Sequence, residues 1–275
     1  MKIAFQGRQG AYSEMALHEH FGKTVDTVGC DAFDDVFDLV IKGEVAFGFI
    51  PVENTIAGTV VENYDLLFAN DVFVIAEAYL PIRHTLLAKK GARLEDIKEA
   101  FSHPHAIKQC KAYLKSKGIR PVPTYDTAGA AQAVAAGDRM DCAAIASALC
   151  AEIYDMEILE RNIQTNSSNT TRFFVIANKE NVPADHVTGK TTVAFKTRHY
   201  PGALVDCLKI FQKYSLNLTK LESRPIPENP WEYVFYAAFE AGIDADEVKS
   251  AIGELTLHAV FVKLLGSYPL AEKCW

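Results

Sequence analysis

Short apolar runs alternate with helical patterns along the first 180 residues or so of this chain. Apolar runs of four to eight residues predict buried strands, and apolar positions that recur every three to four residues predict helices that cover them. This alternation is typical of α/β units on largely parallel sheets. The expected strands are 3–6, 45–51, 99–102, 121–124 and 143–145, and the expected helices are 14–20, 33–42, 107–117 and 128–136.

One long apolar run suggests that this region has two lobes. The run 72–88 is too long for one ordinary strand, and the polar stretch 160–169 is a candidate return crossing. We therefore expect a domain over residues 1–180, with lobe 1 at about 1–76 and 165–180 and lobe 2 at about 77–164. A single-lobed domain is the alternative. Ligands of open α/β sheets bind beyond the carboxyl ends of the strands.

A second pattern begins after 178–189, a polar stretch broken by Pro183 that predicts a linker. The order strand, helix, strand, strand, helix, strand is ferredoxin-like, and we expect this unit over residues 190–275. Its expected elements are strand 191–197, a helix opened by Pro201, strand 216–223 ending at Arg224-Pro225, a turn at Pro227 and Pro230, strand 233–239, helix 244–255 with Asp244 as N-cap, and strand 260–265.

Composition and charge narrow the class of protein. With 275 residues, 49% hydrophobic and 23% charged, the chain has room for about two globular domains. A net charge of −7 without a basic stripe does not indicate a surface that binds nucleic acid. No apolar run approaches the roughly 18 residues of a membrane span, and the N-terminus lacks the features of a signal peptide. We expect a cytoplasmic protein with no membrane partner.

No metal or cofactor is signalled. The six cysteines are scattered without a Cys-x-x-Cys spacing and are expected to be reduced thiols. The pairs His18/His20 and His103/His105 have no carboxylate or cysteine cluster near them in sequence, so they are weak metal signals.

Several loops leave a predicted strand and open a predicted helix, where unpaired backbone N–H groups attract anions. Plain turns and N-caps are the alternative reading of each loop. Together they suit a small dianion, and the candidate substrate-binding residues are Gly10, Ala11, Tyr12, Ser13, Ser102 and Thr127.

Thr171 and Arg172 lie where a polar run, 164–171, becomes an apolar strand pattern. A strand end can hold a hydroxyl and a guanidinium rigidly at a cleft. A strand with a polar start is the alternative. Arg172 either pairs bidentately with a substrate carboxylate or forms a structural salt bridge, and the sequence leaves both open.

Seven segments resemble the prephenate dehydratase family and follow its order. They are GRQGAYS at 7–13, PVENT at 51–55, SHPHAIKQC at 102–110, AAIAS at 143–147, NTTRF at 169–173, HYPGALV at 199–205 and NLTKLESRP at 217–225. Thr55 stands where Ser is usual, His105 replaces a common Gln, and Gln9 a common Pro. These departures bear on substrate preference rather than on reaction class. The chorismate mutase domain that precedes this unit in some relatives is not expected, because the first strand begins at Lys2.

The resemblance implies an enzyme that converts prephenate to phenylpyruvate, with loss of carbon dioxide and water and without a cofactor. It implies a two-lobed catalytic domain like that of type II periplasmic-binding proteins. The implied catalytic residues are Thr171, Arg172, Phe173, Asn54 and Thr55. Thr171 would donate a hydrogen bond to the departing oxygen. Glu53 would repel a dianion, so we expect it to act structurally.

The last two segments resemble the phenylalanine-binding ACT domain of the same family. They imply that phenylalanine regulates the enzyme and that the chain forms a homodimer or homotetramer. The implied effector-binding residues are Gly202, Ala203, Leu204, Val205, Asn217, Leu218, Glu222, Ser223, Arg224 and Pro225.

Two alternatives to prephenate dehydratase remain. Arogenate dehydratase belongs to the same class and acts on an amino acid side chain in place of the pyruvyl group. A small-molecule binding protein with a regulatory domain belongs to a different class, because two-lobed α/β folds often only bind a ligand. The Thr-Arg-Phe triplet argues against the binding protein.

Overall fold

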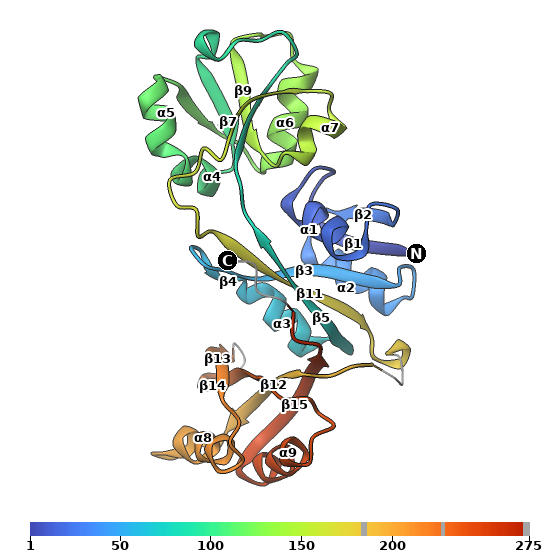
Figure 1. Ribbon diagram of the computed structural model, residues 1–275. Helices are drawn as coiled ribbons and strands as arrows, with labels where there is room; N and C mark the ends of the chain where they lie inside the picture. The colour runs from blue at the N-terminus through green and yellow to red at the C-terminus, as the bar shows by residue number, and fades with distance from the viewer. Residues whose placement is uncertain (183–185, 227–228, 272–275) are drawn as a thin grey trace.

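The computed structural model describes residues 1–182, 186–226 and 229–271. Its ribbon shows three stacked bodies, with the first lobe in the middle, the second lobe above it and the C-terminal unit below (Figure 1). Residues 183–185 of the predicted linker, the turn predicted at Pro227 and one cysteine, Cys274, lie outside the described residues. The other five cysteines are free and buried.

The first lobe is half of a long mixed sheet. β11 lies at its centre and pairs antiparallel with β3 and β5, and β1 pairs parallel with β2 and β3. The strands are β1 (Lys2–Gln6), β2 (Asp26–Cys30), β3 (Phe47–Asn54), β4 (Gly58–Thr59), β5 (Val72–Pro81) and β11 (Thr170–Asn178), and the helices are α1 (Tyr12–Phe21), α2 (Phe33–Ile41) and α3 (Val61–Ala69). A 3₁₀ turn, η2 (Lys179–Asn181), follows β11.

The second lobe has its own sheet, with strand order β10-β6-β9-β7-β8. Its elements are β6 (Thr85–Ala88), η1 (Leu94–Asp96), β7 (Glu99–Ser102), α4 (Pro104–Gln109), α5 (Lys111–Lys117), β8 (Arg120–Pro123), α6 (Thr127–Ala136), β9 (Cys142–Ala146), α7 (Leu149–Ile153) and β10 (Glu157–Arg161). The single helix predicted over 107–117 is wrong. The chain leaves the helical conformation at Cys110, which ends α4 and caps α5.

Two crossings join the lobes, as the sequence predicted. β5 belongs to the first sheet and β6 to the second, so the outward crossing is 82–84, and the return crossing is 162–169. The lobe boundary predicted near residue 76 falls inside β5, which stays paired with β11 as far as Pro81. The two-lobed α/β architecture is confirmed, and its likeness to type II periplasmic-binding proteins stays a prediction.

The C-terminal unit has the predicted βαββαβ order. It comprises β12 (Lys190–Thr197), α8 (Ala203–Lys213), β13 (Leu218–Ile226), β14 (Asn229–Phe239), α9 (Asp246–His258) and β15 (Ala259–Tyr268). The strand order β13-β14-β12-β15 is that of a ferredoxin-like sheet, and both helices pack on one hydrophobic core with it.

Three local predictions in this unit are corrected. β13 runs through Arg224-Pro225 to Ile226, because it is an edge strand and an edge tolerates proline. α8 starts after Gly202, whose φ of 92° is left-handed, rather than at Pro201. Ala245 takes the N-cap position of α9, while the Asp244 carboxylate accepts a hydrogen bond from Thr188.

The sequence predicts separate sheets for the first lobe and the C-terminal unit, but in the structure the two are joined edge to edge. β15 pairs parallel with β5 at one position, Gly266 opposite Val74. A Cβ atom on Gly266 would lie 2.5 Å from the Val74 carbonyl oxygen, so only glycine permits this approach. The first lobe and the C-terminal unit therefore form one continuous ten-stranded sheet.

A buried group of charges lies at this seam. Glu77 of β5, Arg172 of β11 and Lys190 of β12 are 3%, 7% and 2% exposed. The Lys190 ammonium donates to both Glu77 oxygens at 3.1 and 2.9 Å, and Arg172 Nε lies 2.9 Å from Glu77 Oε2. Burial lowers the pKa of Lys190, and the neighbouring Arg172 lowers it further. The Glu77 carboxylate thus pairs with two cations that come from different domains, and Arg172 Nη1 also lies 3.5 Å from Glu53 Oε2.

We expect Glu77→Gln to lower the free energy of unfolding by about 3–5 kcal/mol, because it removes the buried carboxylate that both Arg172 and Lys190 contact. Urea unfolding followed by circular dichroism measures this. The matched control is Glu95→Gln, which breaks the exposed pair with Arg93 and should change the unfolding midpoint little. Similar losses in the two variants would contradict the idea that the seam depends on this carboxylate.

Candidate active site

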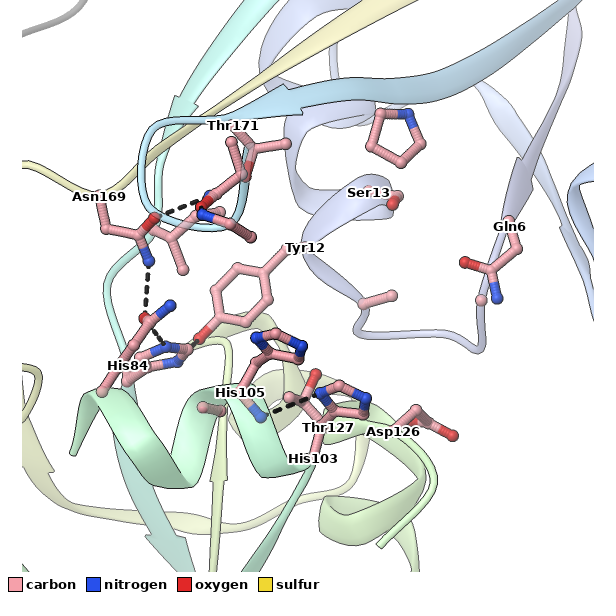
Figure 2. A pocket seen from close by; sticks show the side chains of 18 of the residues that line it. Gln6, Tyr12, Ser13, His84, His103, His105, Asp126, Thr127, Asn169 and Thr171 are labelled. Atoms are coloured by element: carbon pink, nitrogen blue, oxygen red, sulfur yellow. Dashed lines mark hydrogen bonds between the residues drawn. The ribbon is translucent and has the colours of Figure 1, made fainter. Parts of the chain in front are cut away.

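A cavity of about 480 Å³ lies between the two lobes. The first lobe contributes Tyr12 and Ser13 from α1 and Thr171 from β11, and the second lobe contributes His105 and Thr127 from the starts of α4 and α6. Figure 2 shows Thr171 and Asn169 on one side and His84, His103 and His105 on the other, with the ring of Tyr12 between them. The cleft predicted from the sequence is therefore present.

Thr171 and Asn54 form a cross-strand pair at the floor of this cavity. Asn54 Nδ2 donates to Thr171 Oγ1 at 2.9 Å, and Asn54 Oδ1 accepts from the backbone N–H groups of Ile56 and Ala57. Thr171 therefore accepts one hydrogen bond through its oxygen, and its own O–H remains for a ligand. Phe173 also lines the cavity and stacks on Phe49, with ring centroids 4.9 Å apart.

Arg172 and Thr55 do not line this cavity, which corrects their predicted catalytic roles. Successive side chains of a strand face opposite sides, so Arg172 turns away from Thr171 toward the seam. There it pairs with Glu77 and lies 4.8 Å above the Phe174 ring. The structural salt bridge left open by the sequence is the arrangement observed. Thr55 Oγ1 donates to the Ser168 carbonyl and accepts from the Thr170 N–H.

The starts of two helices line the cavity from opposite lobes. α1 begins at Tyr12 and α6 at Thr127, and both residues and Ser13 line the cavity. Asp126 caps α6 by accepting from the Gly129 N–H. Arg8 also lines the cavity and reaches across it to Gln132 at 3.0 Å. Two helix N-termini and one guanidinium favour an anion at this end of the cleft, and the Asp126 carboxylate, 4.0 Å from Arg8 Nε, offsets part of their positive field.

Gly10 and Ser102 support the site but do not line it. Gly10 has a φ of 87°, and a Cβ atom there would lie 2.6 Å from Cys150 Sγ. Its carbonyl accepts from Ser147 Oγ at 2.5 Å, which joins the first lobe to the second. Ser102 is fully buried and donates to the Ile145 carbonyl at 2.6 Å. Both are corrected from substrate contacts to positioning roles, while Ala11 does line the cavity.

Sequence reasoning missed His84, Gln109, Asn169 and the His103/His105 pair as cavity residues. Gln109 lies in the 102–110 motif and Asn169 in the 169–173 motif. A polar side chain at these motif positions could have marked both as site residues. His84 sits in a crossing between strands and carried no local signal. His103 and His105 stack with centroids 5.3 Å apart.

Burial sets the protonation of the cavity side chains. It lowers the pKa of His84, which is 3% exposed, although the hydrogen bond with Gln109 opposes this shift. Burial and the neighbouring His105 lower the pKa of His103. Burial raises the pKa of the Tyr12 phenol. At neutral pH both imidazoles are therefore neutral and the phenol keeps its proton.

The predicted effector residues fall into two places. Gly202, Ala203, Leu204 and Val205 line a second cavity, of about 580 Å³, at the start of α8. The other predicted effector residues lie on the edge strand β13 or just before it, and they do not line that cavity. They are Asn217, Leu218, Glu222, Ser223, Arg224 and Pro225. Two of them face α3 and β4: Arg224 pairs with Asp65 at 2.7 Å, and Glu222 accepts from Thr59. One chain alone does not bring the two sets together.

Within the described residues, no group of three or more His, Cys, Asp and Glu side chains is placed to hold a metal ion. None of the helices in that part of the chain is long and apolar enough to cross a membrane.

Comparison with known proteins identifies the family. The model of the family described as prephenate dehydratase matches residues 3–181. Arogenate dehydratase/prephenate dehydratase 2, a chloroplastic protein of Arabidopsis thaliana, is 36% identical over 98% of this chain and 73% of its own length.

Two solved structures share the fold. A prephenate dehydratase from Arthrobacter aurescens in complex with L-Phe has a TM-score of 0.88 and 28% identity, over 98% of this chain and 89% of its own. GqqA, described as a novel type of quorum quenching acylase, has a TM-score of 0.91 and 32% identity, over 98% of both chains. The cleft, its threonine and these likenesses agree, and the chain belongs to the prephenate dehydratase family.

Proposed function

We propose that this chain is a cytoplasmic lyase that converts prephenate to phenylpyruvate, carbon dioxide and water in phenylalanine biosynthesis. The observation that carries the proposal is the Thr171 hydroxyl at the floor of the interlobe cavity, with its oxygen held by Asn54 and its proton free. The family match over residues 3–181 supports the reaction class.

The cavity offers donors for both carboxylates of prephenate. The N-termini of α1 and α6 carry unpaired N–H groups, and each is worth about 0.3–1 kcal/mol toward an anion at low ionic strength. Ser13 and Thr127 add hydroxyl groups beside them, and Arg8 adds a full positive charge. Asp126 is the one carboxylate among the lining residues; one of its oxygens accepts from the Gly129 N–H, and the other lies 4.0 Å from Arg8 Nε.

The chemistry needs little from the protein because the product ring is aromatic. The bond from the ring to its carboxylate breaks, and carbon dioxide leaves. The electron pair of that bond enters the ring and expels the hydroxyl group on the opposite carbon. Thr171 O–H donates its proton to that departing oxygen, which leaves as water, and Thr171 regains a proton from solvent water. Phe173 and Ile82 give the developing aromatic ring an apolar wall.

We expect Thr171→Ala to lower kcat by at least about 10²-fold, because one well-placed donor to a departing oxygen contributes this much. Thr171→Ser keeps the hydroxyl and should retain most of the turnover. Phenylpyruvate absorbance in alkali measures the rates, and circular dichroism checks that both variants fold. Near-normal turnover by the alanine variant would remove Thr171 from the mechanism.

Substrate choice is tested directly. The purified protein is incubated separately with prephenate and with arogenate, and phenylpyruvate and phenylalanine are quantified. We expect kcat/KM to be higher with prephenate. Arogenate carries an ammonium group, and Asp126 is the one carboxylate in the cavity lining that could pair with it. A preference for arogenate would replace the substrate within the same reaction class. Tight binding of both without turnover would support the binding-protein alternative.

We further propose that phenylalanine binds the C-terminal unit, acting as an ACT domain over residues 190–275, and reduces activity in a homodimer or homotetramer. The cavity at Gly202–Val205 offers the N-terminus of α8 to a carboxylate. The free edge of β13 permits two copies to pair edge to edge, which would let one copy's 217–225 segment approach the other's cavity. The related structure described with L-Phe supports the ligand.

Calorimetry tests the regulation. Phenylalanine should bind with a coupling to substrate of roughly 1–3 kcal/mol, and each ligand should weaken the other by the same factor. Gly202→Ala should weaken phenylalanine, since a side chain at a φ of 92° strains the loop that opens the cavity. Gly253→Ala, inside α9 with open space around it, is the control that should leave binding unchanged. Equal affinity in both variants, or no binding, would defeat the proposal.

A further inference from the structure

A continuous chain of side-chain hydrogen bonds runs from His84 to Thr171 (Figure 2). His84 Nε2 lies 2.7 Å from Gln109 Oε1, and Asn169 Nδ2 donates to the same oxygen at 2.7 Å. Asn54 Nδ2 then donates to Asn169 Oδ1 at 2.7 Å and to Thr171 Oγ1 at 2.9 Å. We call the four residues that lead to Thr171 through these hydrogen bonds the amide ladder: His84, Gln109, Asn169 and Asn54.

The backbone fixes the polarity of the amide ladder. Asn54 Oδ1 accepts from the N–H groups of Ile56 and Ala57, which can only donate. The Asn54 amino group must therefore face Asn169 and Thr171. Asn169 then presents its oxygen to Asn54 and its amino group to Gln109, whose oxygen in turn faces the imidazole.

This polarity also fixes the tautomer of His84. Gln109 Oε1 has only lone pairs, so His84 Nε2 carries the proton and Nδ1 is an acceptor. The Tyr12 hydroxyl lies 2.7 Å from Nδ1 and 3.2 Å from the Arg83 carbonyl oxygen, and it gives its one proton to the nearer acceptor, Nδ1. The Tyr12 proton is thereby used inside the protein, which leaves Thr171 as the hydroxyl of this network whose proton is free for the ligand.

We propose that His84 is a positioning residue: through Gln109 and Asn169 it holds Asn54, and thereby the Thr171 hydroxyl, in the orientation that donates to the departing oxygen. The inference rests on the proposed function. His84 and Asn169 are only 3% and 1% exposed, so solvent replaces a lost hydrogen-bond partner of either side chain poorly. An error in the position of one link is passed along the ladder to the reacting hydroxyl.

The amide ladder also spans the hinge. His84 lies in the outward crossing and Asn169 in the return crossing, while Gln109 ends α4 of the second lobe. Asn54 and Thr171 belong to strands of the first lobe. A rotation of the second lobe relative to the first would therefore break the ladder. Alignment of Thr171 by His84 depends on the arrangement of the lobes seen here.

A double-mutant cycle tests the inference. We expect His84→Ala to lower kcat roughly 10- to 100-fold with little change in KM, since a small misplacement of a reacting group costs this much. In a Thr171→Ala background, where no hydroxyl remains to be positioned, the same substitution should change kcat less than about 2-fold. His84→Gln places an amide N–H near the former Nε2 and should restore most of the turnover.

Asn70→Ala is the matched control, because Asn70 Nδ2 donates to the Leu66 carbonyl at the end of α3 and contacts no member of the ladder. It should lower the melting temperature without changing kcat in either background. Equal fold losses for His84→Ala in the two backgrounds would overturn the inference, because the effect would then not act through Thr171.

A readout independent of turnover separates this inference from the proposed function. Long-range ¹H–¹⁵N correlation spectra of the wild type should show His84 as the neutral tautomer protonated at Nε2. Protonation at Nδ1 would overturn the ladder while the enzyme still acts on prephenate. Failure of the wild type to act on either prephenate or arogenate would instead remove the proposed function.

Discussion

The alternation of side chains along β11 is the constraint on which the two halves of this molecule depend. Thr171 and Phe173 face the cleft, and Arg172 and Phe174 face the seam with the C-terminal unit. β11 is paired on both sides, with β3 and β5, so its register is fixed from two directions. A slip of one residue would exchange the reacting hydroxyl for a guanidinium, so the contacts of each face hold the other in place.

The charges at the seam make the C-terminal unit part of this arrangement. Arg172 is buried beside Glu77, which also pairs with Lys190 from β12, and Tyr268 from β15 accepts from Arg172 at 3.1 Å. A buried ion that loses its partner costs several kcal/mol, so these contacts are either made or broken and do not stretch gradually. A ligand that moves β12 relative to β5 therefore changes what holds Arg172, one residue from Thr171. This is the physical element through which the proposed phenylalanine control acts on the cleft.

The fold was largely predictable because its signals are local. Apolar runs, their length at 72–88 and the βαββαβ order gave two lobes and a ferredoxin-like unit, and the NTTRF segment located Thr171. Strand periodicity alone separates Thr171 from Arg172, but which face meets the cleft depends on distant partners. The amide ladder joins Asn54 to residues 115 and 117 positions away, and the seam closes on one contact between Gly266 and Val74. Neither the amide ladder nor the contact at the seam is encoded in a short segment of sequence, so no local pattern predicted either one.

The arrangement of the lobes and the alignment of the reacting hydroxyl are coupled, because both crossings carry links of the amide ladder. Besides the ladder and the contacts of Tyr12, polar contacts join the lobes, among them Ser147 Oγ to the Gly10 carbonyl and Tyr154 O–H to the Gln9 carbonyl. Neutral hydrogen bonds contribute about 0.5–1.5 kcal/mol each. A dianion that contacts α1 and α6 together would add its binding energy to this arrangement of the lobes. Substrate that contacts one lobe only would not meet a Thr171 that the ladder has aligned.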